Sequence, residues 1–421
     1  MKAAGFKRGS LAVLFVAASA AWAGPVPQGT PFRVSSCPDC RQFVPAVAGH
    51  TTGAFLTVWE GSTAASTQGI NGRFFTSTGA PQGDDFSFGQ AVDPDKYDAA
   101  VTRDKKGNYI LVWSSVTQDN SEIMAQKLQP SGVPLGPAFR VNVDDPLAPT
   151  VPLDYNPVVT PMIDGGFIVI WMSQLPSGVL PSGTNFPGTT PQVLARRFTA
   201  TGVPAGAQVK VSTGLVNGDR PDACVDSSGR PVIVWTTVDA FRPFEPNVKG
   251  VSVRRLSAKG VPLNAAETVV AVPGADSLRP AVSCGNGSTF VVVWHSDDVP
   301  AVAQTDILGQ RFSNQGRPAG AKFIVNSTTT GFQRTPAISH DPSGNFVVVW
   351  QSDQGSRVGI YGRRYTTKGV PTGPEFEVVS DVPNAVAPAN PDVSHIGTKG
   401  NFVVVWQDGS IGGIYGLRFT P

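Results

Sequence analysis

Acidic residues recur shortly after tryptophan residues in the C-terminal half of the chain. Asp297, Asp353 and Asp408 each follow a tryptophan by two or three residues. Pairs of carboxyl groups cleave glycosidic bonds, because one donates a proton to the leaving oxygen while the other acts as base or nucleophile. If the three loops that carry these residues converge, the pattern permits a hydrolase or lyase that acts on a glycan.

Four histidines are the other candidates for catalysis or metal binding. His295 directly precedes a loop that contains Asp297, which is a weak acid–base constellation. His50, His340 and His395 end corresponding segments of neighbouring repeats and could supply three imidazole ligands to a metal ion, but the width of a repeat would separate such positions. We therefore expect these three to be polar residues at the edge of the fold, and we predict no metal site.

The four cysteines are predicted to form two disulfides. Cys37 and Cys40 make a C-x-x-C pair, which could be a redox centre, half of a metal site or a small structural loop. A thioredoxin-like βαβ setting and a second pair of metal ligands are both missing, so we interpret the pair as a structural disulfide. Cys224 and Cys284 lie at nearly equivalent places in two successive repeats, which predicts a bridge between them.

Tryptophans mark a repeat that organises these residues. Seven of the eight tryptophans follow residue 23, at intervals of 54 to 64 residues, and each closes an apolar run such as Phe-Val-Val-Val-Trp. A ligand-stacking role is conceivable, but a tryptophan that ends a valine-rich strand is more simply a core residue. The seven tryptophans are Trp59, Trp113, Trp171, Trp235, Trp294, Trp350 and Trp406.

In each repeat, turn residues divide the sequence into four short segments, as expected for four strands. A proline generally stands fourteen residues before the tryptophan, and an Asp-x-x-Gly turn such as 104–107 separates the first two segments. The third segment often carries paired arginines, as at 363–364, and a Gly-x-Pro-x-Gly turn such as 369–373 leads to the fourth. Aspartate and glycine at these places are typical of tight turns. The repeat therefore predicts a four-stranded antiparallel sheet.

The two ends of the chain predict how the repeats close. The last repeat stops after its third segment, at 416–421, while an unmatched fourth segment lies at 31–35. If the N-terminal strand completes the last sheet, residues 24–421 form one seven-bladed β-propeller. We therefore predict an all-β fold in a single domain.

Composition excludes several classes of protein. The 421 residues include 46 Gly and 37 Pro but only 15% charged residues, with a net charge of +2. These values argue against a disordered chain, a coiled coil or a nucleic-acid-binding protein. No phosphate-loop, dinucleotide or metalloprotease motif is present, so we expect no cofactor.

The N-terminal segment predicts export. Basic residues precede an apolar stretch that ends in Ala21-Trp22-Ala23, which is typical of a secretory signal peptide over residues 1–23. The apolar stretch is too short to span a bilayer. We expect a secreted or periplasmic protein without a membrane span.

The repeat resembles those of secreted bacterial tandem-repeat propellers. The resemblance rests on units such as Gly-Asn-Phe-Val-Val-Val-Trp-Gln (344–351) followed by Gly-Ile-Tyr-Gly-Arg-Arg-Tyr (359–365). It covers the chain after residue 23 and is strongest over 336–421. It implies the propeller fold and carries no catalytic residues, because such scaffolds host unrelated functions.

Loop lengths predict where a ligand would bind. The loops after the tryptophans vary most, and those at 172–190 and 236–249 are the longest. Variable loops on one face of a rigid scaffold usually carry the site. The preferred interpretation is a non-enzymatic propeller that binds a protein or a glycan. The alternatives are an extracellular carbohydrate-active hydrolase or lyase, and a structural module of an envelope assembly. The predicted ligand contacts are Phe186, Phe241, Phe244, His295, Asp297 and Asp353.

Overall fold

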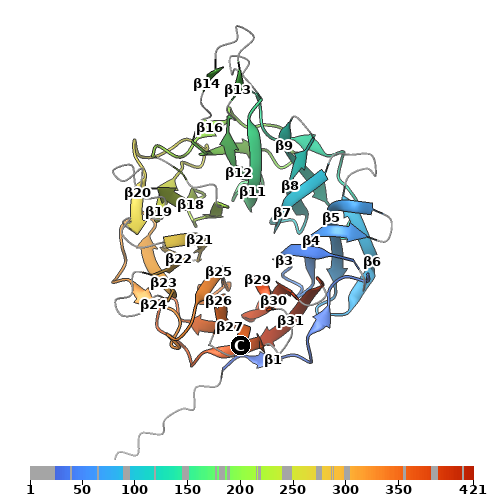
Figure 1. The fold of residues 1–421 in the computed structure, drawn as a ribbon, viewed down its shortest axis with the longest axis vertical. Coiled ribbons are helices and arrows are strands. Elements are labelled where there is room, and N and C mark those ends of the chain that lie inside the picture. The colour runs from blue at the N-terminus through green and yellow to red at the C-terminus, as the bar shows by residue number, and fades with distance from the viewer. Residues whose placement is uncertain are drawn as a thin grey trace, which may run out of the picture.

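The computed structural model is built from β-strands arranged around a central opening (Figure 1). It describes residues 24–37, 40–63, 66–88, 95–117, 120–144, 151–175, 178–179, 185–186, 190–214, 216, 220–238, 249–271, 277–285, 287, 289–297, 304–353, 357–380, 387–409 and 412–421. Within these ranges there is no helix, and hence none that is long and apolar enough to cross a membrane. The predicted all-β class is confirmed.

Four sheets contain four strands each, paired antiparallel in chain order. The first sheet contains β3 (Gln42–Gly49), β4 (Phe55–Thr63), β5 (Ser66–Phe75) and β6 (Pro81–Phe88). The second contains β17 (Asp222–Val225), β18 (Pro231–Val238), β19 (Lys249–Arg255) and β20 (Thr268–Ala271). The third contains β21 (Ser277–Cys284), β22 (Thr289–Ser296), β23 (Asp306–Ser313) and β24 (Phe323–Ile324). The fourth contains β25 (Gln333–His340), β26 (Phe346–Asp353), β27 (Val358–Tyr365) and β28 (Phe376–Ser380).

Two larger sheets and one small hairpin account for the other strands. An eight-stranded sheet joins two units of four through a single parallel bridge between Leu153 and Ser121. Its strands are β7 (Asp95–Arg103), β8 (Tyr109–Val116), β9 (Ser121–Leu128), β10 (Phe139–Arg140), β11 (Leu153–Pro161), β12 (Phe167–Gln174), β15 (Gln192–Phe198) and β16 (Val209–Lys210). A five-stranded sheet contains β1 (Val26–Pro27), β2 (Phe32–Arg33), β29 (Ala389–Ile396), β30 (Asn401–Gln407) and β31 (Ile414–Thr420). The hairpin is β13 (Gly178–Val179) with β14 (Asn185–Phe186).

The N-terminal segment lies in the same sheet as the C-terminal strand. Phe32 of β2 pairs with Gly416 of β31. Two residues after Phe32, the backbone carbonyl of Val34 accepts a hydrogen bond from Arg73 Nη1 at 3.3 Å. An equivalent hydrogen bond runs from Arg196 in β15 to the backbone carbonyl of Val141 at 2.8 Å. Val141 directly follows β10, the fourth strand of the unit that precedes β15. The N-terminal segment thus makes the contacts of a fourth strand.

The innermost strands contact one another in a ring that runs β3, β7, β11, β17, β21, β25, β29 and back to β3. Antiparallel sheets disposed around a central channel in this way are typical of a β-propeller. The predicted disulfides are both present, with Cα separations of 5.5 Å for Cys37–Cys40 and 5.6 Å for Cys224–Cys284. The second bridge joins β17 to β21, which are neighbours in this ring.

The tryptophans are core residues, as predicted. All seven are at most 2% exposed. Trp294 packs with Val232 and Val234, which belong to the preceding sheet, so this cluster spans two sheets. Burial of these rings between sheets holds the sheets together through the hydrophobic effect.

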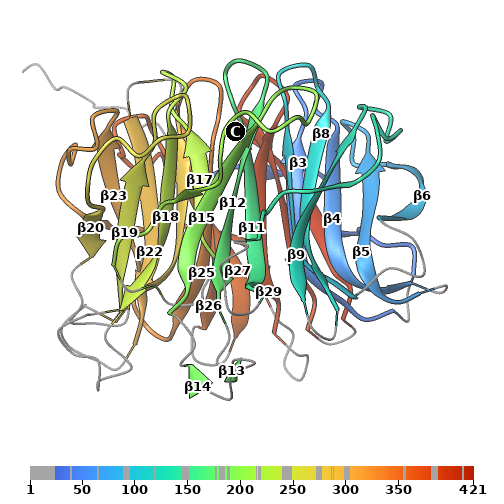
Figure 2. The ribbon, with the colours of Figure 1, turned by 90° about the horizontal axis from the view of Figure 1, so that it is seen from above.

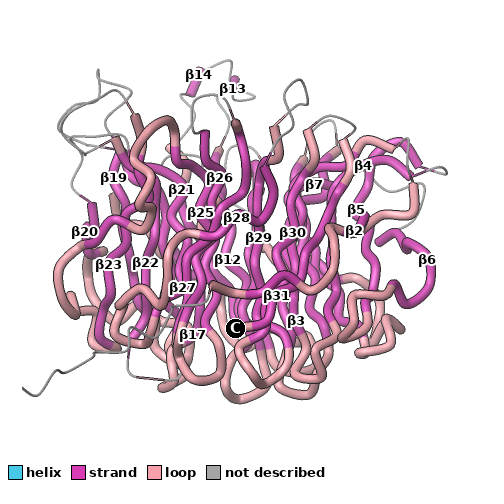
Figure 3. Tube along the Cα trace, turned by 90° about the horizontal axis from the view of Figure 1, so that it is seen from below, coloured by secondary structure: helices cyan, strands magenta, loops and turns pink. Residues whose placement is uncertain are grey.

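The molecule has two unlike faces. At the first, which we call the turn face, Asp-x-x-Gly hairpins such as 104–107 close with a bond from Gly107 N to Asp104 O at 3.0 Å. Figures 2 and 3 show turns gathered on this face and the β13–β14 hairpin at the opposite one. The innermost strands begin at that opposite face, which we call the mouth face.

Candidate functional site

One residue position near the start of each innermost strand forms the candidate site. It directly precedes the repeated proline, or Ala99 in the second repeat, and we call the set the pre-proline ring. Its members are Val44, Asp98, Asn156, Arg220, Arg279, Thr335 and Asn390.

Six members of the pre-proline ring have a left-handed backbone. Their φ angles are 43 to 56°, and Arg220 is the exception. The strand pairing shifts register at each of the six, as between Leu278 and Ala281 around Arg279. A β-bulge re-aims a side chain, and a non-glycine residue in this region costs about 1 to 3 kcal/mol. Strain that recurs in six repeats marks the ring as a candidate functional site.

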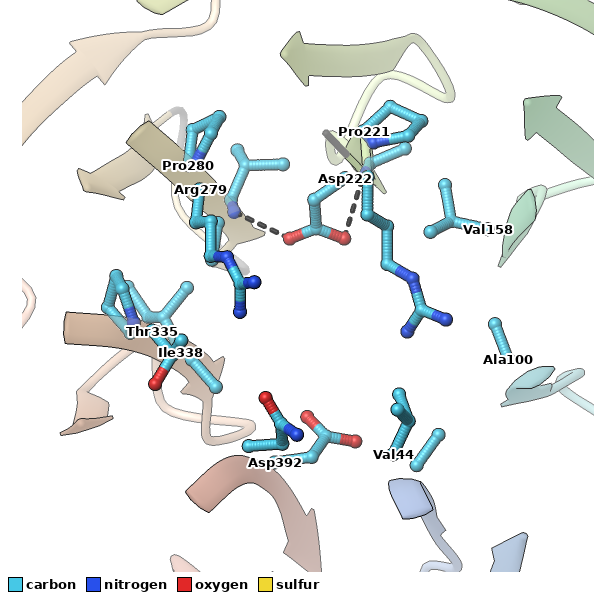
Figure 4. Close-up of a pocket in the computed structure, with 18 of the residues that line it drawn as sticks. Val44, Ala100, Val158, Pro221, Asp222, Arg279, Pro280, Thr335, Ile338 and Asp392 are labelled. Carbon is cyan, nitrogen blue, oxygen red and sulfur yellow. Dashed lines mark hydrogen bonds between the residues drawn. The ribbon is translucent and has the colours of Figure 1, made fainter. Parts of the chain in front are cut away.

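The pre-proline ring lines a cavity of about 590 Å³ in the mouth-face half of the channel. Arg279, Thr335, Val44 and Asp392 project into it from different sheets (Figure 4). The ring supplies acidic, basic, amide, hydroxyl and aliphatic side chains. The cavity is therefore chemically asymmetric although the backbone around it repeats.

Two further carboxyl groups line the cavity, two residues after the pre-proline position. Asp222 accepts hydrogen bonds from the backbone N–H of Ala223 at 2.8 Å and of Val282 at 2.7 Å (Figure 4). Asp392 accepts equivalent bonds from Val47 and Val393, both at 2.8 Å. Burial raises the pKa of Asp222 to about 7 and that of Asp392 to about 6. Both groups can therefore hold a proton close to neutral pH.

A cluster of opposite charges reaches the cavity through Asp98 and Arg220, which both line it. The backbone N–H of Asp98 donates to Glu60 Oε1 at 2.6 Å, and Asp98 Oδ1 lies 3.9 Å from Arg220 Nη2. Ser114 Oγ donates to Asp98 Oδ2 at 3.2 Å. Burial, followed by the charge of Asp98, raises the pKa of Glu60 to about 7. The cluster joins residues of three different sheets.

The predicted ligand contacts are not brought together by the described structure. His295 is 7% exposed, and burial, followed by the charges of nearby arginines, lowers its pKa to about 4. Asp297 is exposed and Asp353 half-buried, and neither lines the cavity. Phe186 ends β14, which Figure 1 places outside the ring of sheets.

The remaining two predicted aromatic contacts, Phe241 and Phe244, lie outside the described residues. The two predicted loops are likewise described only in part. Ligand contact by these residues stays a prediction.

The other three histidines lie toward the turn face. Burial lowers the pKa of His340 and of His395 to about 3, and His395 Nδ1 lies 3.0 Å from Ser339 Oγ. Burial also lowers the pKa of His50. No group of three or more metal-ligating side chains occurs in the part of the chain that the structure describes.

The sequence contained an overlooked signal for the cavity. When the repeats are aligned, the proline is present in six of the seven, whereas the residue before it is of five different types. That contrast distinguishes the pre-proline ring from the rest of the repeat. Asp222 and Asp392 are the corresponding exceptions at a position that is otherwise alanine or valine.

Comparison with known proteins gives the fold alone. No protein-family model matches the chain, and no curated protein matches its sequence. An ulvan lyase of polysaccharide lyase family PL25, bound to a glycan of GlcA and Rha3S, is similar over 92% of this chain and 93% of its own, with 10% identity and a TM-score of 0.56. A protein of unknown function from Dyadobacter fermentans is similar over 93% and 98%, with 10% identity and a TM-score of 0.53. A copper-bound fungal alcohol oxidase of family AA5 has a TM-score of 0.52 at 11% identity, over 93% of this chain and 76% of its own.

Proposed function

We propose that the sheets are seven blades of one closed propeller, formed by residues 24–421, and that residues 1–23 are a signal peptide. The unbroken ring of contacts between innermost strands supports this proposal. The pairing of β2 with β31 and the Arg73–Val34 bond support closure through the N-terminal strand. Two disulfides are typical of an oxidising compartment, in agreement with a secreted or periplasmic protein.

We further propose that the cavity is the site of a carbohydrate-active enzyme, a hydrolase or lyase. One observation carries this proposal: unlike side chains occupy a single repeated, strained backbone position and meet around one cavity. A ring that served only as a scaffold would need no such variety at its mouth. Similarity in fold to a polysaccharide lyase favours a glycan as the ligand over a protein.

The carboxyl groups of the cavity suit acid–base cleavage. Asp222, with a pKa of about 7, can donate a proton to a leaving oxygen near neutral pH. Asp98 lies beside the Arg220 guanidinium and accepts two further hydrogen bonds, from Ser114 and from the backbone of Asn156. Carboxyl groups in such unequal environments can divide the roles of acid and base. We assign the proton donor to Asp222 and the second carboxyl group of the reaction to Asp98.

A non-enzymatic glycan-binding protein is the second candidate. Both carboxylate oxygens of Asp222 already accept backbone hydrogen bonds, one from β17 and one from β21. These bonds connect two neighbouring innermost strands whether or not the protein catalyses a reaction. This observation favours binding without turnover.

Turnover assays with matched variants test the proposal. Purified protein would be incubated with neutral and acidic polysaccharides, and the release of reducing ends and of unsaturated products would be followed. We expect Asp222→Asn to lower turnover about 100-fold or more, since general acid catalysis contributes factors of that size. Asp84→Asn, at an exposed position of β6, should leave turnover unchanged. Equal activity of both variants would refute the assignment, and binding without any turnover would favour the second candidate.

A further inference from the structure

Arg279 presents a free guanidinium to the cavity. It belongs to the pre-proline ring, with φ of 48°, and its exposed side chain points into the cavity (Figure 4). Among described residues, no hydrogen bond or ion pair engages this side chain. A strained backbone therefore supports a charge that no described group of the protein neutralises.

Arg220 brings a second guanidinium to the same space. It lies just before β17, the neighbour of β21 that carries Arg279, and both residues line the cavity. Its ion pair with Asp98, at 3.9 Å, is close to the longest distance for such a contact. The charge of Arg220 also lowers the pKa of Asp222 and of Asp392 against the effect of burial. Its guanidinium is thus close enough to influence groups from several sheets.

Two more cations, which do not line the cavity, act on the same histidine as Arg279. Burial and, after it, the positive charges of Arg279, Arg334 and Lys249 lower the pKa of His295, so this imidazole is neutral. Arg334 stacks over the Phe332 ring, with Cζ 4.2 Å from the ring centroid. These cations come from three successive sheets. Glu60 and Asp98 lie on other sheets, whereas Asp222 lies on β17, two residues after Arg220.

The cavity lining favours a charged ligand over a neutral sugar. Its described residues are aliphatic, small or charged, with two amides, and include no aromatic ring on which the apolar face of a sugar could stack. A guanidinium matches the two oxygens of a carboxylate or sulfate group with parallel hydrogen bonds. Arg220 and Arg279 thus supply groups that can recognise an anion, in a lining that also contains the carboxyl groups of Asp98, Asp222 and Asp392.

We propose that the ligand of this cavity is an anionic saccharide, and that Arg279 together with Arg220 binds its carboxylate or sulfate group. The inference deepens the proposed function and rests on it in placing a glycan in the cavity. A uronate and a sulfate ester share this chemistry, so the two sources are separated by experiment.

Binding measurements on Arg279→Gln test the inference. The probes are an oligoglucuronate, a sulfated galactan oligosaccharide and neutral cellohexaose, each titrated calorimetrically at low and high salt. Arg317→Gln is the matched control, because Arg317 is an exposed arginine in the turn after β23, on the turn face. Arg220→Gln is a second variant, and thermal unfolding checks that all variants fold.

We expect one or both anionic probes to bind, more weakly at high salt, and cellohexaose not to bind. Arg279→Gln should weaken binding about 10- to 100-fold, the range for hydrogen bonds to charged groups, and Arg317→Gln should not. Unchanged affinity of Arg279→Gln, tighter binding of cellohexaose, or no binding of either anionic probe would overturn the inference. Turnover of a neutral glycan would defeat this inference and leave the enzyme proposal standing. Binding of an anionic probe without turnover would support this inference and count against the enzyme proposal.

Discussion

The Cys224–Cys284 disulfide allows a quantitative test of how the sheets beside the cavity are held. It joins β17 to β21, just beyond Asp222 and Arg279, and Cys224 lines the cavity. A cross-link stabilises a protein by restricting the unfolded chain, more strongly for a longer loop. The sequence separation here is 60 residues, against 3 for Cys37–Cys40.

The two separations imply different losses of stability. The loop-entropy relation gives about 4 kcal/mol for the long loop and about 1.6 kcal/mol for the short one. We therefore expect the Cys224→Ala/Cys284→Ala variant to lose about 4 kcal/mol in the free energy of unfolding. The Cys37→Ala/Cys40→Ala variant is the matched control and should lose less than half as much.

Denaturant unfolding followed by tryptophan fluorescence measures both losses, because all seven tryptophans beyond residue 23 are buried. The dependence of the unfolding free energy on denaturant should be compared between variants, since a changed slope reports a changed unfolded state. Equal losses, or a larger loss from the short loop, would refute the reasoning.

Three further predictions concern the core and the cavity. Because the pKa of Asp222 is raised to about 7, its protonation stabilises the folded state fully below pH 4, and this stabilisation is lost as the pH rises through about 7. Asp222→Asn should therefore reduce the decline in the free energy of unfolding between pH 4 and 7 by about 1.4 kcal/mol per pH unit. Parallel curves of unfolding free energy against pH for the two proteins would contradict this. Thr335→Gly should be neutral or stabilising by about 1 kcal/mol in denaturant unfolding, because relief of left-handed strain offsets the entropy cost of glycine, whereas Thr289→Gly in β22 should destabilise. Trp294→Ala should lower the free energy of unfolding by about 3 to 5 kcal/mol but leave ligand affinity unchanged in calorimetry; lost affinity would argue for a tryptophan in the site.

Local rules predicted most of the fold. Aspartate and glycine at 104 and 107 specify a turn that the structure contains, and the buried tryptophans follow from their place at the end of valine-rich strands. The bridge from Cys224 to Cys284 follows from their nearly equivalent positions in successive repeats. These features depend on short-range patterns that recur in every repeat, so comparing the repeats of one sequence is enough to find them.

The cavity was harder to predict because it depends on backbone geometry. The bulge at Arg279 turns its side chain into the channel. The regular alternation of side chains along a strand does not predict this orientation. The interaction of Glu60 with Asp98 joins strands that only the folded ring brings together. Phe186 belongs to a hairpin that Figure 1 places outside the ring of sheets, and its contact with a ligand stays a prediction.

A crystal structure with a bound oligosaccharide tests the central claim most directly. The ligand would be the acidic oligosaccharide that binds most tightly in the titrations. The account predicts density in the channel cavity, with the anionic group against Arg279 and Arg220. Density on the β13–β14 hairpin or on the outer strands, with an empty cavity, would contradict it.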